Sequence, residues 1–466
     1  MATKTVLNTE LDEANVAEST GLIGHPRGLG TLFFTELWER FSYYGMRSIL
    51  ILYATSTAAE GGLGLSVKDA ASIYGTCTMS VYLTALPGGL VADYLTGARL
   101  AVFIGGVIIA CGHFSMVFQS MTTFYLGLVL IAIGTGLLKP NISTMVGGLY
   151  RQNDPRRDSG FSIFYMGINL GSVLAGFGVG YLAKGVTFKR FLSWMGWDPN
   201  ASWHWGFGAA GVGMVLGLII YVLNQGRLKG VGNRIRKASK DKPDVASREP
   251  LTRDDWKRIA VIFIFFLFTI LFWGAYEQKG ASLNLFADRL VRAEIFGVGF
   301  PVPFLQSLTG IFVIILAPIF SFLWVRLKDR QPSSPMKFTF GLVFIGLAFM
   351  LLVPASMLTV EGKVSFWWLV GLYFLAVCGE MCLSPVGLST VTKLAPLKLV
   401  GIMMGIWFLA ASFGNKLAGY LSGFFVANDP WRLTMMYGGI ALGLFASAAV
   451  LALLTPTIKR LMGKVH

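Results

Sequence analysis

The sequence predicts an all-α integral membrane protein with twelve transmembrane helices in two six-helix bundles. Of its 466 residues, 54% are hydrophobic and 14% are charged, and the mean hydropathy is +0.63. Soluble domains carry about 25% charged residues. Apolar runs of about 18–25 residues recur along the chain, which is the length that a helix needs to cross a bilayer. These observations exclude a soluble fold.

Twelve apolar segments can be counted, and they form two sets of six. The first set covers residues 31–58, 68–92, 98–119, 122–148, 160–184 and 203–224. The second set covers residues 257–288, 304–327, 337–358, 365–395, 400–427 and 432–456. The predicted domains are a mobile cytoplasmic N-terminus (1–30), an N-terminal bundle (31–224), a basic cytoplasmic linker (225–256), a C-terminal bundle (257–456) and a cytoplasmic tail (457–466).

The net charge of +15 does not indicate a nucleic-acid partner, because the basic residues follow the predicted topology. Of the 39 Lys and Arg residues, 26 lie in segments on the N-terminal side of the membrane and 8 on the other side. The remaining five lie inside spans and are Arg40, Arg47, Lys139, Lys279 and Lys416. By the positive-inside rule both termini are cytoplasmic. We therefore expect a multi-pass protein of the cell (inner) membrane.

The residues that carry most enzyme and metal chemistry are few and scattered. All four cysteines, Cys77, Cys111, Cys378 and Cys382, lie in predicted spans. The four histidines, His25, His113, His204 and His466, form no nucleophile–base or metal-ligand pattern. We expect no enzymatic activity, no metal and no cofactor.

The first span carries four charged side chains. Each charge at the centre of a membrane helix costs roughly 2.5–3.5 kcal/mol on insertion scales. At 100° per residue, most of the polar side chains of this span fall within an arc of about 100°, with Glu39 at its edge. This polar face comprises Glu36, Glu39, Arg40, Tyr43, Tyr44 and Arg47. Such a face must line a wet cavity inside the protein.

The fourth and fifth spans also contain polar residues. Lys139 is followed by Pro140, which frees a backbone carbonyl. The alternative for Lys139 is an ammonium that extends to the membrane interface. Asn169 lies among small residues, where an amide can also hold two helices together.

Carboxylates occur in the seventh and tenth spans. If residues 257–288 form one α-helix, Trp273, Glu277 and Asn284 share a face within about 40°. Lys279 then points away from that face, as a snorkelling or helix-pairing residue. Glu380 lies mid-span before Pro385. A membrane carboxylate near a cation can exchange a proton for a salt bridge; the alternative is a permanent structural ion pair.

These side chains together predict a cavity with both signs of charge and many aromatic rings, including Tyr82 and Trp407. Both signs of charge suit a zwitterion, and aromatic walls suit groups of varied shape. From the residues alone we predict a proton-driven transporter for a small zwitterionic organic solute.

Two six-span halves joined by a basic loop are typical of major facilitator transporters, which bind substrate near the midplane between the halves. The loop after the second span, residues 88–99, resembles the Gly/Asp/Gly/Arg motif of that superfamily. Residues 325–330 form a degenerate counterpart in the second half. The alternative is an ordinary charged turn.

The first-span motif, Glu36-x-x-Glu39-Arg40-Phe41-x-Tyr43-Tyr44-Gly45, resembles the signature of the proton-coupled oligopeptide transporter (POT/PTR2) family, and the chain resembles its bacterial members. Further matches follow in order along the chain. They are Lys139-Pro140-Asn141, Phe164-Tyr165-x-x-Ile168-Asn169-x-Gly171-Ser172, Trp273-x-x-x-Glu277-Gln278, Glu380-x-x-x-Ser384-Pro385-Val386-Gly387-Leu388 and Gly405-Ile406-Trp407-Phe408. The motifs cover spans one to eleven.

The resemblance implies proton-coupled symport of di- and tripeptides into the cell by alternating access, with the peptide bound between the two bundles. It implies proton coupling by Glu36, Glu39, Arg40, Lys139 and Glu380. It implies substrate binding by Arg40, Tyr43, Tyr44, Arg47, Tyr82, Lys139, Asn169, Trp273, Glu380, Ser384 and Trp407. An ion pair between Arg47 and Glu277 would act as an outer gate. The expected partners are peptides, protons and the lipid bilayer, with the monomer as the functional unit.

The chain departs from the family pattern in three places. Many bacterial relatives insert two helices between the halves, whereas residues 225–256 are polar and too short for a spanning hairpin. Animal members carry a functional His in the second span, which has none here, so protonation would rest on carboxylates. Thr309 stands where relatives often have Asn.

Two other hypotheses about the function stay open. One is transport of another solute, such as nitrate, a drug or a peptide-like antibiotic, although paired carboxylates do not suit a lone anion. The other is a membrane enzyme or a nutrient sensor, for which neither a catalytic constellation nor an added soluble domain is evident.

Overall fold

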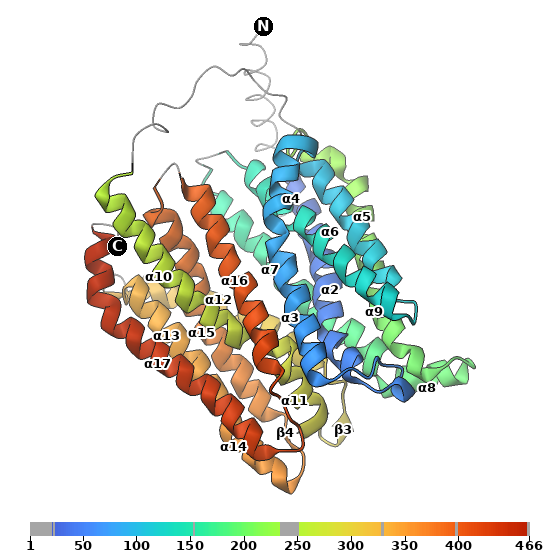
Figure 1. Ribbon diagram of the computed structural model, residues 1–466. Coiled ribbons are helices and arrows are strands. Elements are labelled where there is room, and N and C mark those ends of the chain that lie inside the picture. Colours follow the sequence, from blue (N-terminus) through green and yellow to red (C-terminus); the bar gives the residue numbers. More distant parts are fainter. Residues whose placement is uncertain are drawn as a thin grey trace. The chain divides into compact units, whose positions relative to one another are not determined.

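The computed structural model describes residues 21, 24–151, 154–233, 251–327, 330–396 and 399–463 (Figure 1). Helices occur at all twelve predicted span positions. In the described part of the chain, nine helical segments are long and apolar enough to cross a membrane. The predicted all-α membrane fold is confirmed.

The helices before the central linker begin with α2 (Arg27–Thr55), α3 (Val67–Leu83), α4 (Ala85–Val91) and α5 (Ala98–Ser115). They continue with α6 (Met121–Gly148), α7 (Arg157–Lys184), α8 (Val186–Trp194) and α9 (Ser202–Leu223). After the linker come α10 (Arg253–Tyr276), α11 (Ser282–Leu290), α12 (Phe304–Leu327), α13 (Ser334–Met350), α14 (Leu352–Leu358), α15 (Trp367–Leu394), α16 (Val400–Ser422) and α17 (Pro430–Met462).

Short strands lie in the connections of the second half. β1 (Val291–Arg292) pairs in parallel with β4 (Val364–Ser365). β2 (Glu294–Ile295) and β3 (Val298–Gly299) form an antiparallel hairpin. These strands were not predicted, because two-residue strands leave no periodicity to detect.

Packing divides the chain into two compact units. The first consists of Met1–Tyr53, Ala58–Leu63 and Ser80–Ala238, and the second of Ala54–Thr57, Gly64–Met79 and Ser239–His466. In the first unit α5 packs against α6 and α9; in the second α13 packs against α15 and α17. The predicted domain boundaries stay a prediction. Residues 234–250 of the linker, most of the predicted N-terminus and residues 464–466 of the predicted tail lie outside the described residues.

Three predicted spans are interrupted helices. The second span divides at Thr84 into α3 and α4, and the ninth divides at Leu351 into α13 and α14. The Thr84 hydroxyl lies 2.8 Å from the carbonyl oxygen of Ser80 and 2.7 Å from that of Ala132 in α6. A side chain that bonds backbone in this way competes with the helix ladder. The seventh span is divided by a 3₁₀ turn, which affects the functional site described below.

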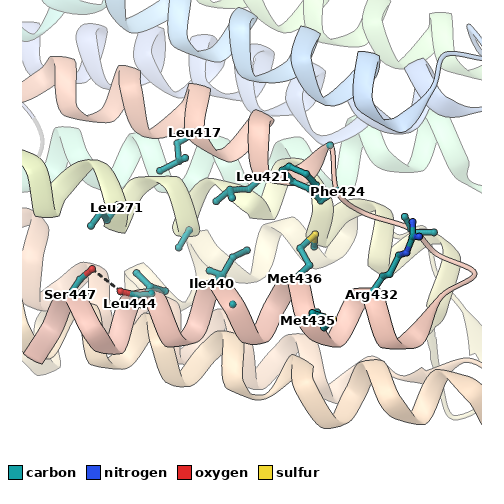
Figure 2. Close-up of a pocket in the computed structure, with 15 residues that line it drawn as sticks. Leu271, Leu417, Leu421, Phe424, Arg432, Met435, Met436, Ile440, Leu444 and Ser447 are labelled. Atoms are coloured by element: carbon teal, nitrogen blue, oxygen red, sulfur yellow. Dashed lines mark hydrogen bonds between the residues drawn. The ribbon is translucent and has the colours of Figure 1, made fainter.

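In the second unit, α10, α16 and α17 border an apolar groove of about 890 Å³ (Figure 2). Leucines from α10 and α16 face Ile440 and Leu444 of α17 across it. The α16–α17 turn, with Arg432, lies at one end.

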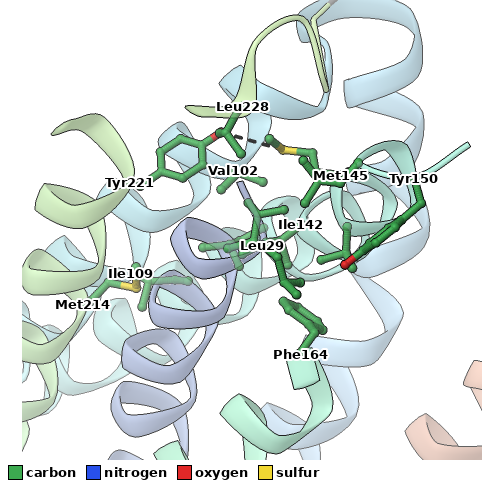
Figure 3. Close-up of a cluster of buried hydrophobic side chains, with 14 of the residues drawn as sticks. Leu29, Val102, Ile109, Ile142, Met145, Tyr150, Phe164, Met214, Tyr221 and Leu228 are labelled. Carbon is green, nitrogen blue, oxygen red and sulfur yellow. Dashed lines mark hydrogen bonds between the residues drawn. The ribbon is translucent and has the colours of Figure 1, made fainter. Parts of the chain in front are cut away.

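The core of the first unit includes a buried cluster at the end of the bundle where α2 begins (Figure 3). It contains Leu29, Ile142 and Phe164, and the Tyr221 hydroxyl lies 3.7 Å from the Met145 sulfur. The Tyr221 hydroxyl also donates to the backbone carbonyl of Arg99 at 3.0 Å.

The loop motif of residues 88–99 joins α4 to α5 and is more than a charged turn. A π-helical turn (Ala92–Thr96) leads into Gly97, whose φ of 79° favours glycine. The Arg99 amide donates to the Gly232 carbonyl at 2.8 Å and its guanidinium to the Gln225 carbonyl at 3.4 Å. The motif thereby ties the start of α5 to the segment after α9. Residues 328–329 of the second-half counterpart lie outside the described residues.

We predict that Gly88→Ala destabilises the first unit. A Cβ at Gly88 would lie 2.0 Å from the Gly136 carbonyl oxygen, so α4 and α6 would have to separate. Overpacking of this kind costs about 1–3 kcal/mol. The thermal unfolding midpoint in detergent should fall. The matched control is Gly89→Ala, because a Cβ there meets nothing within 4 Å. Equal midpoints for the two variants would contradict the role of this close approach.

Candidate functional site

The polar face of α2 forms a compact ion cluster in the first unit. Arg40 Nε lies 3.1 Å from Glu36 Oε1 and forms a second, closer ion pair with Glu39 Oε2. The three side chains are between 0% and 3% exposed. Two carboxylates therefore converge on one nitrogen of one guanidinium, away from solvent.

The cluster is incompletely satisfied. Glu36 Oε2, Glu39 Oε1 and Arg40 Nη2 are buried and have no hydrogen-bond partner among the described residues. Leaving a buried polar atom without a partner costs about 1–3 kcal/mol, and more when it is charged. Such atoms are candidate positions for a proton, a water molecule or a ligand group.

Aromatic rings surround the guanidinium. The Arg40 Cζ lies 5.3 Å from the ring centroid of Tyr43 and 6.0 Å from that of Tyr44. The two phenols meet edge to face, with centroids 5.4 Å apart. A cation within about 6 Å of a ring face is attracted by the ring quadrupole. The rings thus help to hold Arg40 in place without neutralising it.

Lys139 belongs to the same region. Its ammonium lies 3.9 Å from the ring centroid of Tyr82, and its charge acts on Glu36. Next along α6, the Asn141 amide donates to the Leu137 carbonyl at 2.7 Å and to the Gly88 carbonyl at 3.3 Å. Lys139 therefore faces the interior of the first unit, which argues against the snorkelling alternative.

Close packing fixes α7 beside the cluster. A Cβ at Gly171 would lie 2.3 Å from the Leu37 carbonyl oxygen and 2.9 Å from Arg40 Cβ, so only glycine allows this approach. Two residues earlier on α7, the Asn169 amide donates to the Tyr165 carbonyl of its own helix at 3.0 Å. This bond is within α7, so it does not support the helix-pairing alternative for Asn169.

Glu380 is the centre of the polar site in the second unit. The Tyr276 hydroxyl donates a short hydrogen bond to Glu380 Oε2. The Lys279 ammonium lies 3.9 Å from the Tyr276 ring centroid, and its charge acts on Glu380. The carboxylate therefore has a phenol donor and a cation close by, the arrangement in which protonation and ion pairing compete.

The prediction that Lys279 points away from a shared face of Trp273, Glu277 and Asn284 does not hold for the observed backbone. It assumed one helix over residues 257–288, but α10 ends at Tyr276 and a 3₁₀ turn covers Glu277–Gly280. Ala281, with φ −124° and ψ −102°, separates this turn from α11. An angle of 100° per residue does not hold across such a break. The shared face of Trp273, Glu277 and Asn284 therefore has no basis in a continuous helix.

Tyr276 and Lys279 were not among the predicted site residues. The spacing of Glu277, Lys279 and the glycine after it could have suggested a break, since Gly280 is disfavoured inside a helix. A Cβ at Gly280 would lie 1.8 Å from the Tyr74 hydroxyl, so the turn also needs glycine for close packing.

The other predicted residues of the second unit occupy varied positions. Trp273 meets Tyr276 edge to face, with centroids 5.2 Å apart. Trp407 is buried against Phe338, and a Cβ at Gly387 would lie 2.2 Å from its ring. Glu277 and Asn284 are buried, and Ser384 is half-buried. In the first unit, Arg47 is also buried.

Thr309 is buried close to this site. Its hydroxyl has no hydrogen-bond partner among the described residues. It borders a cavity of about 10 Å³ together with Tyr276 and Lys279. That volume is about the smallest that holds a water molecule.

A polar contact at the start of α2 was also not predicted. His25 Nδ1 lies 2.9 Å from the Tyr150 hydroxyl, and His25 Nε2 lies 3.5 Å from Ser159 Oγ. Burial raises the pKa of the Tyr150 hydroxyl to about 12. Arg156 bonds Asp154 and, at 2.8 Å, the Gly24 carbonyl. These bonds join the beginning of α2 to the α6–α7 connection.

Solved structures share this fold. A peptide transporter POT in complex with alafosfalin matches with a TM-score of 0.87 and 36% identity, covering 98% of this chain and 99% of that one. A POT family transporter in complex with 5-aminolevulinic acid matches with a TM-score of 0.84 and 29% identity, covering 95% and 98% of the two chains. The architecture is that of a helical membrane transporter with the major facilitator fold.

Comparison with known sequences gives the family. The peptide transporter YePEPT of Yersinia enterocolitica is 38% identical, covering 95% of this chain and 96% of that protein. The di-/tripeptide transporter of Lactococcus lactis subsp. lactis is 33% identical, covering 98% and 100%. The family model PTR2, POT family, matches residues 99–237 and 246–433. The chain belongs to the POT family, which is a family of transporters.

We predict that the Arg40 cluster makes the stability of an Arg40→Gln variant depend on pH. Without the guanidinium, the buried carboxylates of Glu36 and Glu39 lose their ion pairs with Arg40, although the charge of Lys139 still acts on Glu36. Breaking a buried pair in this way costs about 3–5 kcal/mol. Protonation relieves that cost, so the variant loses more stability at pH 8 than at pH 5. Thermal unfolding in detergent measures the difference.

The control is the double variant Arg40→Gln/Glu39→Gln, which removes one of the unpaired carboxylates. Its thermal midpoint at pH 8 should lie above that of Arg40→Gln. An Arg40→Gln midpoint that falls equally at both pH values would contradict the assignment of charge in this cluster.

Proposed function

We propose that this protein imports di- and tripeptides in symport with protons, by alternating access, with the peptide bound between its two bundles. The observation that carries the proposal is the buried Arg40 cluster, in which two carboxylates share one guanidinium and two carboxylate oxygens have no partner within the described part of the chain. The membership of the POT family and the peptide transporters among the similar proteins support it.

The charges suit the two ends of a peptide. We assign the peptide carboxylate to Arg40, Arg47 and Lys139 of the first unit, and the peptide amine to Glu380 of the second unit with Asn169. Guanidinium groups bind carboxylates in a fixed geometry, which supports the first assignment. The polar and aromatic groups assigned to the pocket wall are Tyr43, Tyr44, Tyr82, Trp273, Ser384 and Trp407.

Proton coupling is assigned to Glu36, Glu39, Arg40, Lys139 and Glu380. Each of these carboxylates has a cation nearby, and a proton on the carboxylate weakens that ion pair. The cation is then available to another anion. The proton gradient supplies the free energy, and we propose no cofactor.

The placement in the membrane follows from the charge distribution. We propose a multi-pass protein of the cell (inner) membrane with both termini in the cytoplasm, since 26 of 39 basic residues then lie on the cytoplasmic side. We propose the monomer as the functional unit.

A related candidate is transport of another peptide-like compound. The complexes of similar proteins with alafosfalin and 5-aminolevulinic acid make this worth testing. A competition panel of amino acids, dipeptides, tripeptides and these two compounds would rank them. The proposal of peptide transport requires that dipeptides compete better than single amino acids.

We predict that proteoliposomes take up labelled dialanine under an inward proton gradient. Glu39→Gln should abolish gradient-driven uptake and leave counterflow exchange measurable, because the variant keeps a polar partner for Arg40 but cannot exchange a proton. Absence of uptake by folded wild-type protein would count against peptide symport. Equal loss of uptake and exchange in Glu39→Gln would count against its role in coupling.

We predict that Glu380 recognises the peptide amine. Glu380→Gln should weaken binding of dialanine about tenfold, equivalent to about 1.4 kcal/mol. It should leave the weak binding of N-acetyl-dialanine unchanged, because that compound has no amine charge. Glu294→Gln, in the exposed β2–β3 hairpin, is the control. A tenfold loss of affinity for both compounds would show that Glu380 has a structural role and does not recognise the amine.

We predict that Arg47 and Glu277 act as a pair in gating. Arg47→Glu and Glu277→Arg should each reduce counterflow of dialanine at least tenfold, whereas the double variant should recover part of it. Like charges at this position would repel, and the exchange restores attraction. No recovery in a folded double variant would reject the pairing.

A further inference from the structure

The apolar groove of the second unit is separate from the residues assigned to peptide and proton. Its wall comes from α10, α16 and α17, with Leu271, Leu417 and Leu444 among the lining side chains (Figure 2). Most of the lining is apolar, and among the described residues that line the groove Arg432, at one end, is the charged one. A charged dipeptide would lose its hydration in this groove without compensating polar contacts. The groove is therefore unsuited to binding a second peptide.

The groove has the length of one membrane leaflet. Its lining runs along α17 from Arg432 to Ser447, which is about 22 Å at 1.5 Å per residue. Half of a bilayer including its headgroup region is about 20–22 Å. A chain lying in the groove would therefore reach from the headgroup level to the middle of the bilayer.

Two glycines keep the α17 side of the groove open. A Cβ at Gly439 or Gly443 would meet nothing within 4 Å, although both positions line the groove. Around both positions the described residues therefore leave open space. Its shape suits an unbranched hydrocarbon chain, which can follow a shallow channel between helices.

The end of the groove at the α16–α17 turn carries a charge that suits a phosphate. Arg432 lines this end, and its Nε lies 3.2 Å from Asp429 Oδ2. Asp429 also caps α17 by accepting from the Arg432 amide. The guanidinium has five N–H groups and its side chain is 69% exposed, so donors remain for an anion. The N-terminus of α17 adds a positive partial charge.

We propose that this groove binds one glycerophospholipid, with an acyl chain between α10, α16 and α17 and the phosphate at Arg432. Asp429, 39% exposed, is placed to attract the ammonium of a zwitterionic headgroup. The observations that carry this are the leaflet length of the groove, the open space at its glycines and the guanidinium at its mouth. In the proposed topology the lipid belongs to the outer leaflet.

The experiment uses the full chain in nanodiscs that contain a phosphatidylethanolamine with a photoreactive diazirine in one acyl chain. After illumination, mass spectrometry of peptides locates the labelled residues. We expect labels concentrated on the groove-lining residues of α16 and α17. Gly443→Leu places a side chain in the open space and should lower this labelling at least fivefold. Ala449→Leu, at an exposed α17 position that does not line the groove, should leave it unchanged.

A second probe tests the phosphate. Wild-type protein should prefer the phospholipid probe to a diacylglycerol carrying the same diazirine chain, and Arg432→Gln should remove this preference. Circular dichroism and thermal unfolding establish that the variants are folded. Labels spread evenly over exposed positions of α17, or labelling that Gly443→Leu leaves unchanged, would overturn the proposal. Cross-links between two copies of the chain at the groove residues would show that the groove is a dimer interface and not a lipid site.

Discussion

The interaction on which the first unit depends is the bonding of Glu36 and Glu39 to a single nitrogen of Arg40. Three charges that are almost unexposed would be prohibitively costly apart from one another. The three side chains lie close together because they share one face of α2. Other groups pack closely against that face. Gly171 allows α7 to approach at Arg40, and the rings of Tyr43 and Tyr44 lie beside the guanidinium. The packing of α2 at this level is therefore arranged around the buried charges of Glu36, Glu39 and Arg40 rather than around an apolar stripe.

The second unit also places a buried carboxylate near a cation, and it does so with an interrupted helix. Ending α10 at Tyr276 allows its hydroxyl to reach Glu380, and the 3₁₀ turn that follows brings Lys279 over the Tyr276 ring. A continuous helix would have directed Lys279 away. Each unit thus combines a carboxylate, a cation and a phenol, although the first takes them from consecutive turns of α2 and the second from α10, the 3₁₀ turn and α15.

The sequence was sufficient for the membrane-helix fold and for the proximity of the charged side chains of α2, because both follow from local pattern. Apolar length locates the spans, and helical spacing brings Glu36 and Arg40 together four residues apart. The sequence was insufficient where tertiary contacts determine the backbone conformation and where a helix ends. The break after Tyr276 depends on Gly280 meeting Tyr74, and the division at Thr84 on a hydrogen bond to Ala132. Neither contact can be read from neighbouring residues, so Lys279 was misplaced and Tyr276 was missed.

The shared nitrogen of Arg40 also explains how, on the proposed function, proton and peptide would be coupled. With both carboxylates ionised, an incoming peptide carboxylate meets two negative charges beside the one guanidinium. A proton on Glu39 would remove one of them, and Nη2, which has no hydrogen-bond partner among the described residues, would then serve as a donor for the peptide. Linkage requires the reverse as well: a bound peptide carboxylate must raise the affinity of Glu39 for its proton by the same factor. On the proposed function, symport by this cluster would therefore follow from competition between anions for one cation, with the charge of Lys139 acting on Glu36.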